Sequence, residues 1–210
     1  RDFVLDYRLA GDAIQSGVLL SKGRDENFFL AMVEPPAVVS PSAIVPRDYV
    51  FVVDVSGSME GFPLDTARTL MNDLLGGLRA SDTFNVMLFA GDNAVFAERS
   101  VPATRANVDS AIATLANMPG GGGTELLPAL RRALALPLDR DRARTIVVIT
   151  DGYVSIEREA FALIRGNLSN ASVFAFGIGS SVNRMLIEGI ARAGQGEPFV
   201  VLDPSQAPTA

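Results

Sequence analysis

An apolar run that ends in an acid constrains this chain more than any other feature of its sequence. Tyr49 to Val53 reads YVFVV, a β-branched and aromatic stretch typical of a strand buried on both faces of a parallel sheet. The run stops at Asp54, and an ionisable side chain at the end of a buried strand must be paired, hydrogen-bonded or bound to a metal. Ser56 and Ser58 follow at alternating positions. A loop leaving the strand can therefore turn three oxygen-bearing side chains to one side, with Gly57 permitting the tight curl.

A second strand ends in the same way. Arg144 to Thr150 contains the apolar stretch TIVVIT and is followed by Asp151, and a glycine-rich segment between the two strands, Pro119 to Leu126, carries Thr124 just before an expected helix. In open α/β sheets the ligand crevice lies outside the carboxyl ends of the strands, so these side chains and Asp54 are expected at one edge. Two acids there would repel each other without a cation between them. Carboxylate and hydroxyl oxygens suit Mg²⁺ or Mn²⁺ better than zinc, so we predict a magnesium-type site.

Together these motifs resemble the metal-ion-dependent adhesion site of von Willebrand factor A domains. The resemblance covers Pro46 to Leu202, roughly three quarters of the chain, and its five motif positions are intact: Asp54, Ser56, Ser58, Thr124 and Asp151. It implies an α/β fold of the Rossmann-like kind, a doubly wound and mostly parallel sheet flanked by helices. It also implies a domain that binds other proteins and is not an enzyme.

The resemblance further implies a mode of binding. Ser56, Ser58 and Thr124 would coordinate the ion directly, and Asp54 and Asp151 would act mostly through bound waters, because Mg²⁺ takes only about six oxygens. An Asp or Glu carboxylate of a partner protein would complete the shell. The expected cofactor is Mg²⁺ or Mn²⁺, with Ca²⁺ as an alternative. Residues flanking the metal loops are predicted to form the ligand-binding rim: Met59, Glu60, Gly123, Glu125 and Tyr153.

Composition excludes other classes of protein. The net charge of −6, from 18 basic and 24 acidic residues, argues against nucleic-acid binding. Cysteine and histidine are both absent, which excludes a disulfide framework, a thiolate nucleophile, a Ser-His-Asp triad and an HExxH zinc site within this chain.

Two alternatives to a metal-dependent adhesion domain are considered. A Mg²⁺-dependent aspartate phosphotransferase of the haloacid-dehalogenase kind also has an Asp at the end of its first strand. It needs a second Asp two residues later, where this chain has Ser56, and a downstream Lys, whereas Lys22 is the only lysine and precedes the fold. The other alternative is a structural A domain without ligand activity, which differs only in whether a ligand binds.

The chain is expected to have four parts. Residues 1–34 alternate in strand fashion and resemble the tail of the domain that precedes the A domain in inter-α-trypsin-inhibitor heavy chains and bacterial relatives; a β-rich lead-in without a function of its own is the alternative. Residues 35–46 form a proline-rich linker, 47–204 the A domain, and 205–210 a tail. No apolar stretch of membrane-spanning length occurs. We expect the chain to be part of a longer protein that is extracellular, on the cell surface or periplasmic.

Hydrophobic periodicity predicts the elements of the A domain. Strands are expected at 49–53, 83–89, 94–97, 144–150, 172–177 and 198–202, and helices from about 64, at 105–116, 126–136, 156–168 and 183–193. Pro63 suits the first turn of the first helix. Ser180 and Ser181 are predicted to cap the last helix.

Overall fold

The computed structural model describes residues 15–35, 39, 44–118, 120–152, 157–168 and 171–203. The chain divides into two compact units, residues 1–45 and residues 46–210. Each unit is described by itself. Among the described residues, no helix is both long enough and apolar enough to cross a bilayer.

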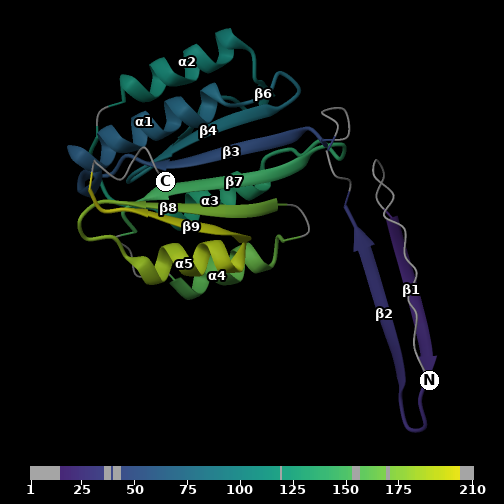
Figure 1. Cartoon of the computed structure of the whole chain (residues 1–210). Helices are drawn as coiled ribbons and strands as arrows, with labels where there is room; N and C mark the ends of the chain where they lie inside the picture. The colour runs from purple at the N-terminus through teal and green to yellow at the C-terminus, as the bar shows by residue number, and fades with distance from the viewer. Residues whose placement is uncertain are drawn as a thin grey trace. The chain divides into compact units, whose positions relative to one another are not determined.

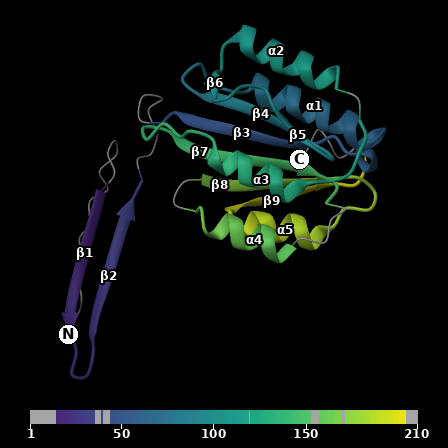
Figure 2. The same cartoon turned by 180° about the vertical axis from the view of Figure 1, so that it is seen from behind.

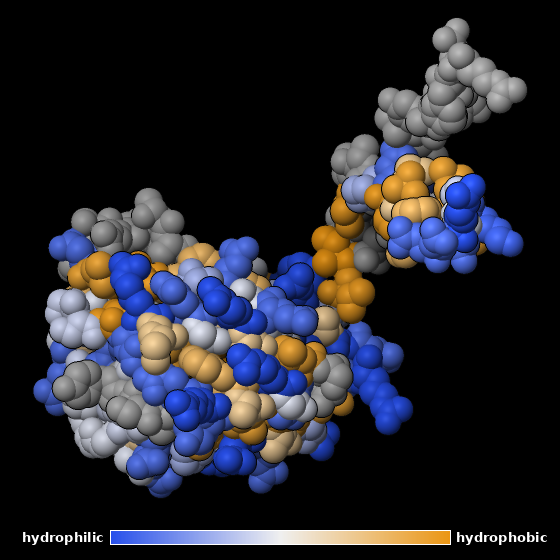
Figure 3. Space-filling model, turned by 90° about the horizontal axis from the view of Figure 1, so that it is seen from below, coloured by the Kyte–Doolittle hydropathy of each residue, from blue (hydrophilic) through white to orange (hydrophobic). Residues whose placement is uncertain are grey.

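The first unit contains a β-hairpin whose side chains are largely exposed. β1 (Gln15–Lys22) pairs antiparallel with β2 (Asn27–Glu34), so that Leu19 lies opposite Leu30 and Leu20 opposite Phe29. These two pairs lie on opposite faces because successive residues alternate, and both faces therefore carry exposed apolar groups. The orange atoms of the hairpin in Figure 3 show this surface. Within the segment 1–34, where strand-like alternation was expected, β1 and β2 are strands, and residues 1–14 lie outside the described residues.

The second unit is built on one mostly parallel sheet. Its described strands run in the order β5-β4-β3-β7-β8-β9, with β6 also paired to β4. β4 to β3, β3 to β7, β7 to β8 and β8 to β9 are parallel, and β5 and β6 run antiparallel to β4. The strands are β3 (Arg47–Asp54), β4 (Thr83–Phe89), β5 (Asn93–Val95), β6 (Val101–Pro102), β7 (Ala143–Thr150), β8 (Ala171–Ile178) and β9 (Gln195–Val201).

Helices cover both faces of this sheet (Figures 1 and 2). One face carries α1 (Phe62–Gly76) and α2 (Arg105–Ala116), and the other carries α3 (Leu126–Ala135), α4 (Glu157–Arg165) and α5 (Arg184–Ala193). Alternate residues of β3 enter the two cores. Phe51 and Val53 pack with α1 and α2, while Val50 and Val52 pack with the other three helices. This arrangement confirms the predicted doubly wound α/β fold.

Differences from the expected elements are local and have physical causes. α4 ends at Arg165, three residues before the predicted end, because the hydrogen bonding changes there: the N–H of Gly166 still bonds to the carbonyl of Ala162 at 3.0 Å, but that of Asn167 bonds to Ile164, only three residues back, at 2.9 Å. The two-residue strand β6 was not expected, since so short a segment has no periodicity of its own. The predicted capping of α5 by Ser180 and Ser181 is wrong. Asn183 is the cap, and its side-chain oxygen accepts from the N–H of Leu186 at 3.1 Å.

Candidate functional site

The candidate site lies where the order of the strands reverses. β3 pairs with β4 on one side and with β7 on the other, so the loops that leave β3 and β7 diverge to opposite faces of the sheet. Val53 lies opposite Ile149, which brings the carboxyl ends of β3 and β7 to the same edge. In open α/β sheets this switch point forms the crevice in which ligands bind.

Asp54, the last residue of β3, is fully buried, and each of its carboxylate oxygens has a protein donor. Oδ1 accepts from the backbone N–H of Ser56 at 2.9 Å, and Oδ2 accepts from the hydroxyl of Thr150 at 2.6 Å. Burial raises the pKa of Asp54 above its ordinary value; hydrogen bonds from Ser56 and Thr150 oppose the shift, and the charge of Asp151 adds to it. The site therefore holds a carboxylate whose charge lacks a neutralising partner among these contacts.

Ser56 and Ser58 place two hydroxyl oxygens side by side. The distance between their Oγ atoms is 3.3 Å, with Ser56 fully buried and Ser58 exposed. The chain makes one turn of 3₁₀ helix here, Gly57–Met59, which curls the loop tightly. Two adjacent oxygen ligands of an octahedral ion bound at about 2.0–2.1 Å would lie about 2.9 Å apart. The measured separation is close to that value, so the two hydroxyls fit neighbouring positions around such an ion.

The glycine-rich segment is tied to the loop after β3 by two backbone bonds. Gly57 donates to the carbonyl of Gly122 at 3.1 Å, and Gly121 donates to that of Val55 at 2.9 Å. Gly121 and Gly122 have φ angles of 142° and 86°, a region that favours glycine. Thr124 follows, half-buried, two residues before α3 begins. The segment therefore carries Thr124 to the edge at which Asp54 ends β3, while Pro119 lies outside the described residues.

Asp151 completes the set of predicted metal residues. It follows β7, is 8% exposed, and accepts at its backbone carbonyl from the N–H of Asn183 at 3.1 Å. Asp151 and Ser58 both line a hollow of about 270 Å³, so the structure brings the second acid beside the serine loop. Within the described part of the chain, no three acidic side chains form a metal-binding cluster. Any ion at this edge would therefore depend on the hydroxyl oxygens as well.

The predicted rim residues differ in their exposure. Glu60, Gly123 and Glu125 are exposed, and Tyr153 lies outside the described residues. Met59 is fully buried in the core formed with α1 and α2. Its side chain packs under the loop after β3 and does not contribute to the exposed rim.

Three residues of this edge were not predicted to belong to the site. Thr150 links the two acid-bearing segments, because its hydroxyl donates to Asp54 and its oxygen accepts from the N–H of Gly152 at 2.9 Å. A polar residue at the end of the apolar run TIVVIT was the available signal. Ser180 and Ser181 line the same hollow as Asp151, and their sequence shows no feature that separates a ligand contact from a cap.

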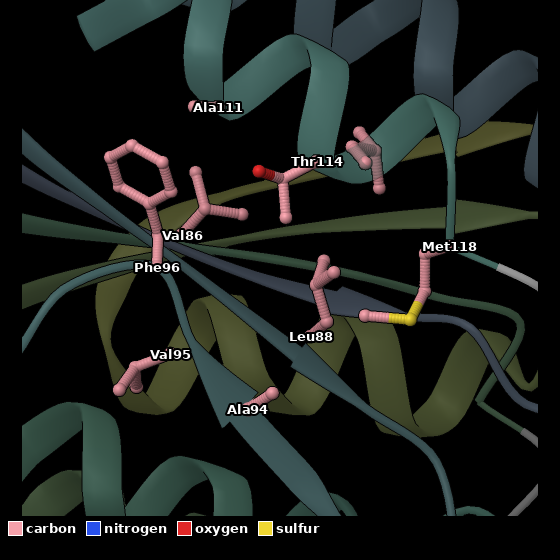
Figure 4. A pocket seen from close by; sticks show the side chains of 9 residues that line it. Val86, Leu88, Ala94, Val95, Phe96, Ala111, Thr114 and Met118 are labelled. Atoms are coloured by element: carbon pink, nitrogen blue, oxygen red, sulfur yellow. The ribbon is translucent and has the colours of Figure 1, made fainter.

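A second hollow lies away from these oxygens. It measures about 40 Å³ and lies between β4, β5 and α2, lined mainly by apolar side chains such as Leu88, Phe96 and Met118 (Figure 4). Thr114 provides the side-chain oxygen visible there. Such a lining does not suit an ion. Of these two hollows, the one at the carboxyl ends of β3 and β7 is therefore the candidate metal site.

Comparisons with known proteins agree with this fold. The family model described as von Willebrand factor type A domain matches residues 47–198. A von Willebrand factor A domain-containing protein of Dictyostelium discoideum is 31% identical over 168 residues, covering 77% of this chain and 18% of that protein. Inter-alpha-trypsin inhibitor heavy chain H3 of Bos taurus is 26% identical over 220 residues, covering 98% of this chain and 24% of that protein.

Solved structures show the same fold. The structure titled von Willebrand factor type A from Catenulispora acidiphila has a TM-score of 0.71 at 15% identity, covering 96% of this chain and 49% of that one. BatB from Bacteroides thetaiotaomicron, titled a conserved hypothetical protein, has a TM-score of 0.66 at 20% identity, covering 77% and 93%. The chain spans less than a quarter of the length of the curated relatives described above.

Proposed function

Because the chain belongs to the von Willebrand factor type A domain family, we propose that it is a protein-binding domain in which a bound Mg²⁺ bridges to an acidic side chain of a partner. The observation that carries the proposal is the pair of Ser56 and Ser58 oxygens, 3.3 Å apart at the edge where two buried acids end their strands. Mn²⁺ would fit the same oxygens, and Ca²⁺ is an alternative with longer bonds.

The contacts support a division of roles between hydroxyls and carboxylates. Ser56, Ser58 and Thr124 would touch the ion, whereas Asp54 would act through waters, since both of its oxygens already accept hydrogen bonds from the protein. Asp151 would balance charge from the β7 side. When bound, the ion supplies a local positive charge that a partner carboxylate can contact, in a chain whose net charge is −6.

The proposal is one of binding and not of catalysis. The phosphotransferase alternative needs Asp54 as an exposed nucleophile, and its complete burial and two hydrogen bonds oppose that role. A structural A domain without ligand activity is the second candidate. We place the domain within a longer protein that is extracellular, on the cell surface or periplasmic, in keeping with its family.

Binding of one divalent ion per chain is the first expected result. Calorimetric titration of Mg²⁺ or Mn²⁺ into the metal-stripped protein should show a single site and raise the melting temperature, because binding to the folded state alone adds stability by mass action. At an ion concentration 100 times the dissociation constant the gain is about 2.7 kcal/mol. Ser58→Ala should weaken the titration, and the exposed, remote Ser110→Ala should not. A folded protein that takes up no ion would refute the proposal.

Thr124 provides a test of bridging. Thr124→Ala should weaken binding of an acidic partner by roughly tenfold more than it weakens metal binding, because Ser56 and Ser58 still hold the ion while the ligand-ready state loses a direct contact. Parallel titrations of the ion, and of a single-Glu peptide selected from a library in Mg²⁺, measure the two effects. Equal losses would mean that Thr124 is only a fixed ligand of the ion.

A further inference from the structure

The hollow beside the candidate metal site contains two hydroxyl groups that the proposed coordination does not use. Ser180 and Ser181 line it together with Pro63, Gly179 and the two metal-site residues Ser58 and Asp151. Its volume of about 270 Å³ is far above the roughly 10–15 Å³ that a single water molecule needs. The hollow can therefore hold a small polar group next to the ion.

The loop that carries the two serines is held in place at both ends. The N–H of Gly179 donates to the carbonyl of Val201 at 3.0 Å, and the N–H of Asn183 donates to that of Asp151 at 3.1 Å. Both serines are exposed, and neither caps α5, because Asn183 does. The two serines thus line the same hollow as Asp151, and α5 does not need their hydroxyls as caps.

Gly179 lines the hollow without a side chain that would fill it. Its φ of 135° favours glycine, and an added Cβ would lie 3.6 Å from Cγ of Pro63 and 3.7 Å from Cβ of Asp151. A larger residue there would fill part of the space between the serines and the acid. The backbone conformation therefore favours the one residue type that leaves this space open.

A carboxylate that reaches an ion through one oxygen leaves the other oxygen to be satisfied by a donor. Among the described side chains lining the hollow, the carboxylate of Asp151 can only accept, and a Ser58 bound to the ion through its oxygen keeps a proton for which Asp151 is the acceptor in the same lining. Among the described residues of that lining, the hydroxyls of Ser180 and Ser181 are the remaining side-chain donors.

We infer that Ser180 and Ser181 donate hydrogen bonds to the second oxygen of the partner carboxylate, an inference that rests on the proposed metal-bridged function. The two serines then make the site selective for a planar, two-oxygen ligand. They act on the ligand directly and leave the affinity for the ion unchanged.

Acetate is a suitable probe because it is the smallest ligand with this chemistry apart from formate. Its methyl protons relax faster when acetate lies near Mn²⁺, so weak binding to the Mn²⁺-loaded full chain is measurable by NMR titration, and a separate calorimetric titration gives Mn²⁺ affinity. The double variant S180A/S181A should bind acetate about tenfold or more weakly, with unchanged Mn²⁺ affinity. The variant S180T/S181T, which keeps both hydroxyls, should restore acetate binding, and Ser110→Ala should behave as the unaltered chain.

The possible results separate the inference from the function on which it rests. Equal Mn²⁺-dependent acetate binding by the unaltered chain and S180A/S181A would overturn the role of the serines and leave the metal bridge standing. Loss of Mn²⁺ affinity in the double variant would also overturn it, since the serines would then serve the ion. Mn²⁺ binding without acetate binding to the unaltered chain would overturn both the bridge and the inference.

Discussion

Replacing Arg144 by alanine is expected to lower the free energy of unfolding by about 3–5 kcal/mol. Arg144 and Asp48 lie opposite each other on β7 and β3, at the end of the sheet away from the candidate metal site. Nε and Nη2 of Arg144 donate to Oδ2 of Asp48 at 2.9 and 2.6 Å, and both side chains are almost completely buried. The guanidinium also donates to the carbonyls of Leu136 and Pro137, each at 2.6 Å. Its removal leaves a buried carboxylate without its cation and two carbonyls without a donor.

Urea unfolding of Arg144→Ala measures this loss, and two variants show whether charge is the cause. Arg105→Ala breaks the pair with Asp109 on the surface of α2, where the arginine side chain is 90% exposed, and should change stability little. The double variant D48L/R144M removes both charges and should cost less than Arg144→Ala, because no unpaired charge remains in the interior. A double variant no more stable than Arg144→Ala would show that the unpaired charge is not the cause, and that the packing and carbonyl contacts of the arginine account for the loss.

The sequence predicted the buried elements well because their signals are local. β4 and α2 begin and end where the apolar pattern predicts, at Thr83 and Phe89 and at Arg105 and Ala116. Thr104, which was not predicted as a cap, caps α2 by accepting from the N–H of Asn107 at 3.3 Å. By contrast, β6 consists of two residues that pair with β4, and only the folded sheet determines it.

The positions of the two acids could be predicted from the sequence, and those of the groups around them less well. An acid at the end of a buried strand is visible in sequence, because an apolar run such as YVFVV rarely leads into Asp54 without a reason. The role of Thr150 depends on the pairing of β7 with β3, which brings residues 96 positions apart within 2.6 Å. The positions of Ser180 and Ser181 depend on the loop after β8 folding back towards Asp151. Met59 was predicted on the rim because it directly follows the serine loop. Its burial depends on the packing of α1, which the sequence does not reveal at this position.

Exchanging Asp54 for asparagine is expected to lower Mg²⁺ affinity by roughly 10- to 100-fold or more while leaving the metal-free fold at least nearly as stable. The carboxylate has the shape of the amide, and Oδ1 of asparagine can still accept from the N–H of Ser56. The charge, however, is lost. Burial and the neighbouring Asp151 both disfavour an ionised Asp54, as the raised pKa indicates, so the metal-free protein gives up an unfavourable charge when asparagine replaces it.

Calorimetry with Mg²⁺ and urea unfolding without it measure the two consequences separately. Asp73→Asn, which removes an exposed carboxylate on α1, should leave both quantities unchanged and controls for the loss of one negative charge from the chain. Retained Mg²⁺ affinity in Asp54→Asn would mean that the acid serves only the loop after β3. A large loss of metal-free stability would mean that the hydrogen bond from Thr150 outweighs the cost of burying the charge. The expected pattern is weaker metal binding with an intact fold. It would mean that the buried carboxylate of Asp54 serves to bind the ion and does not stabilise the sheet.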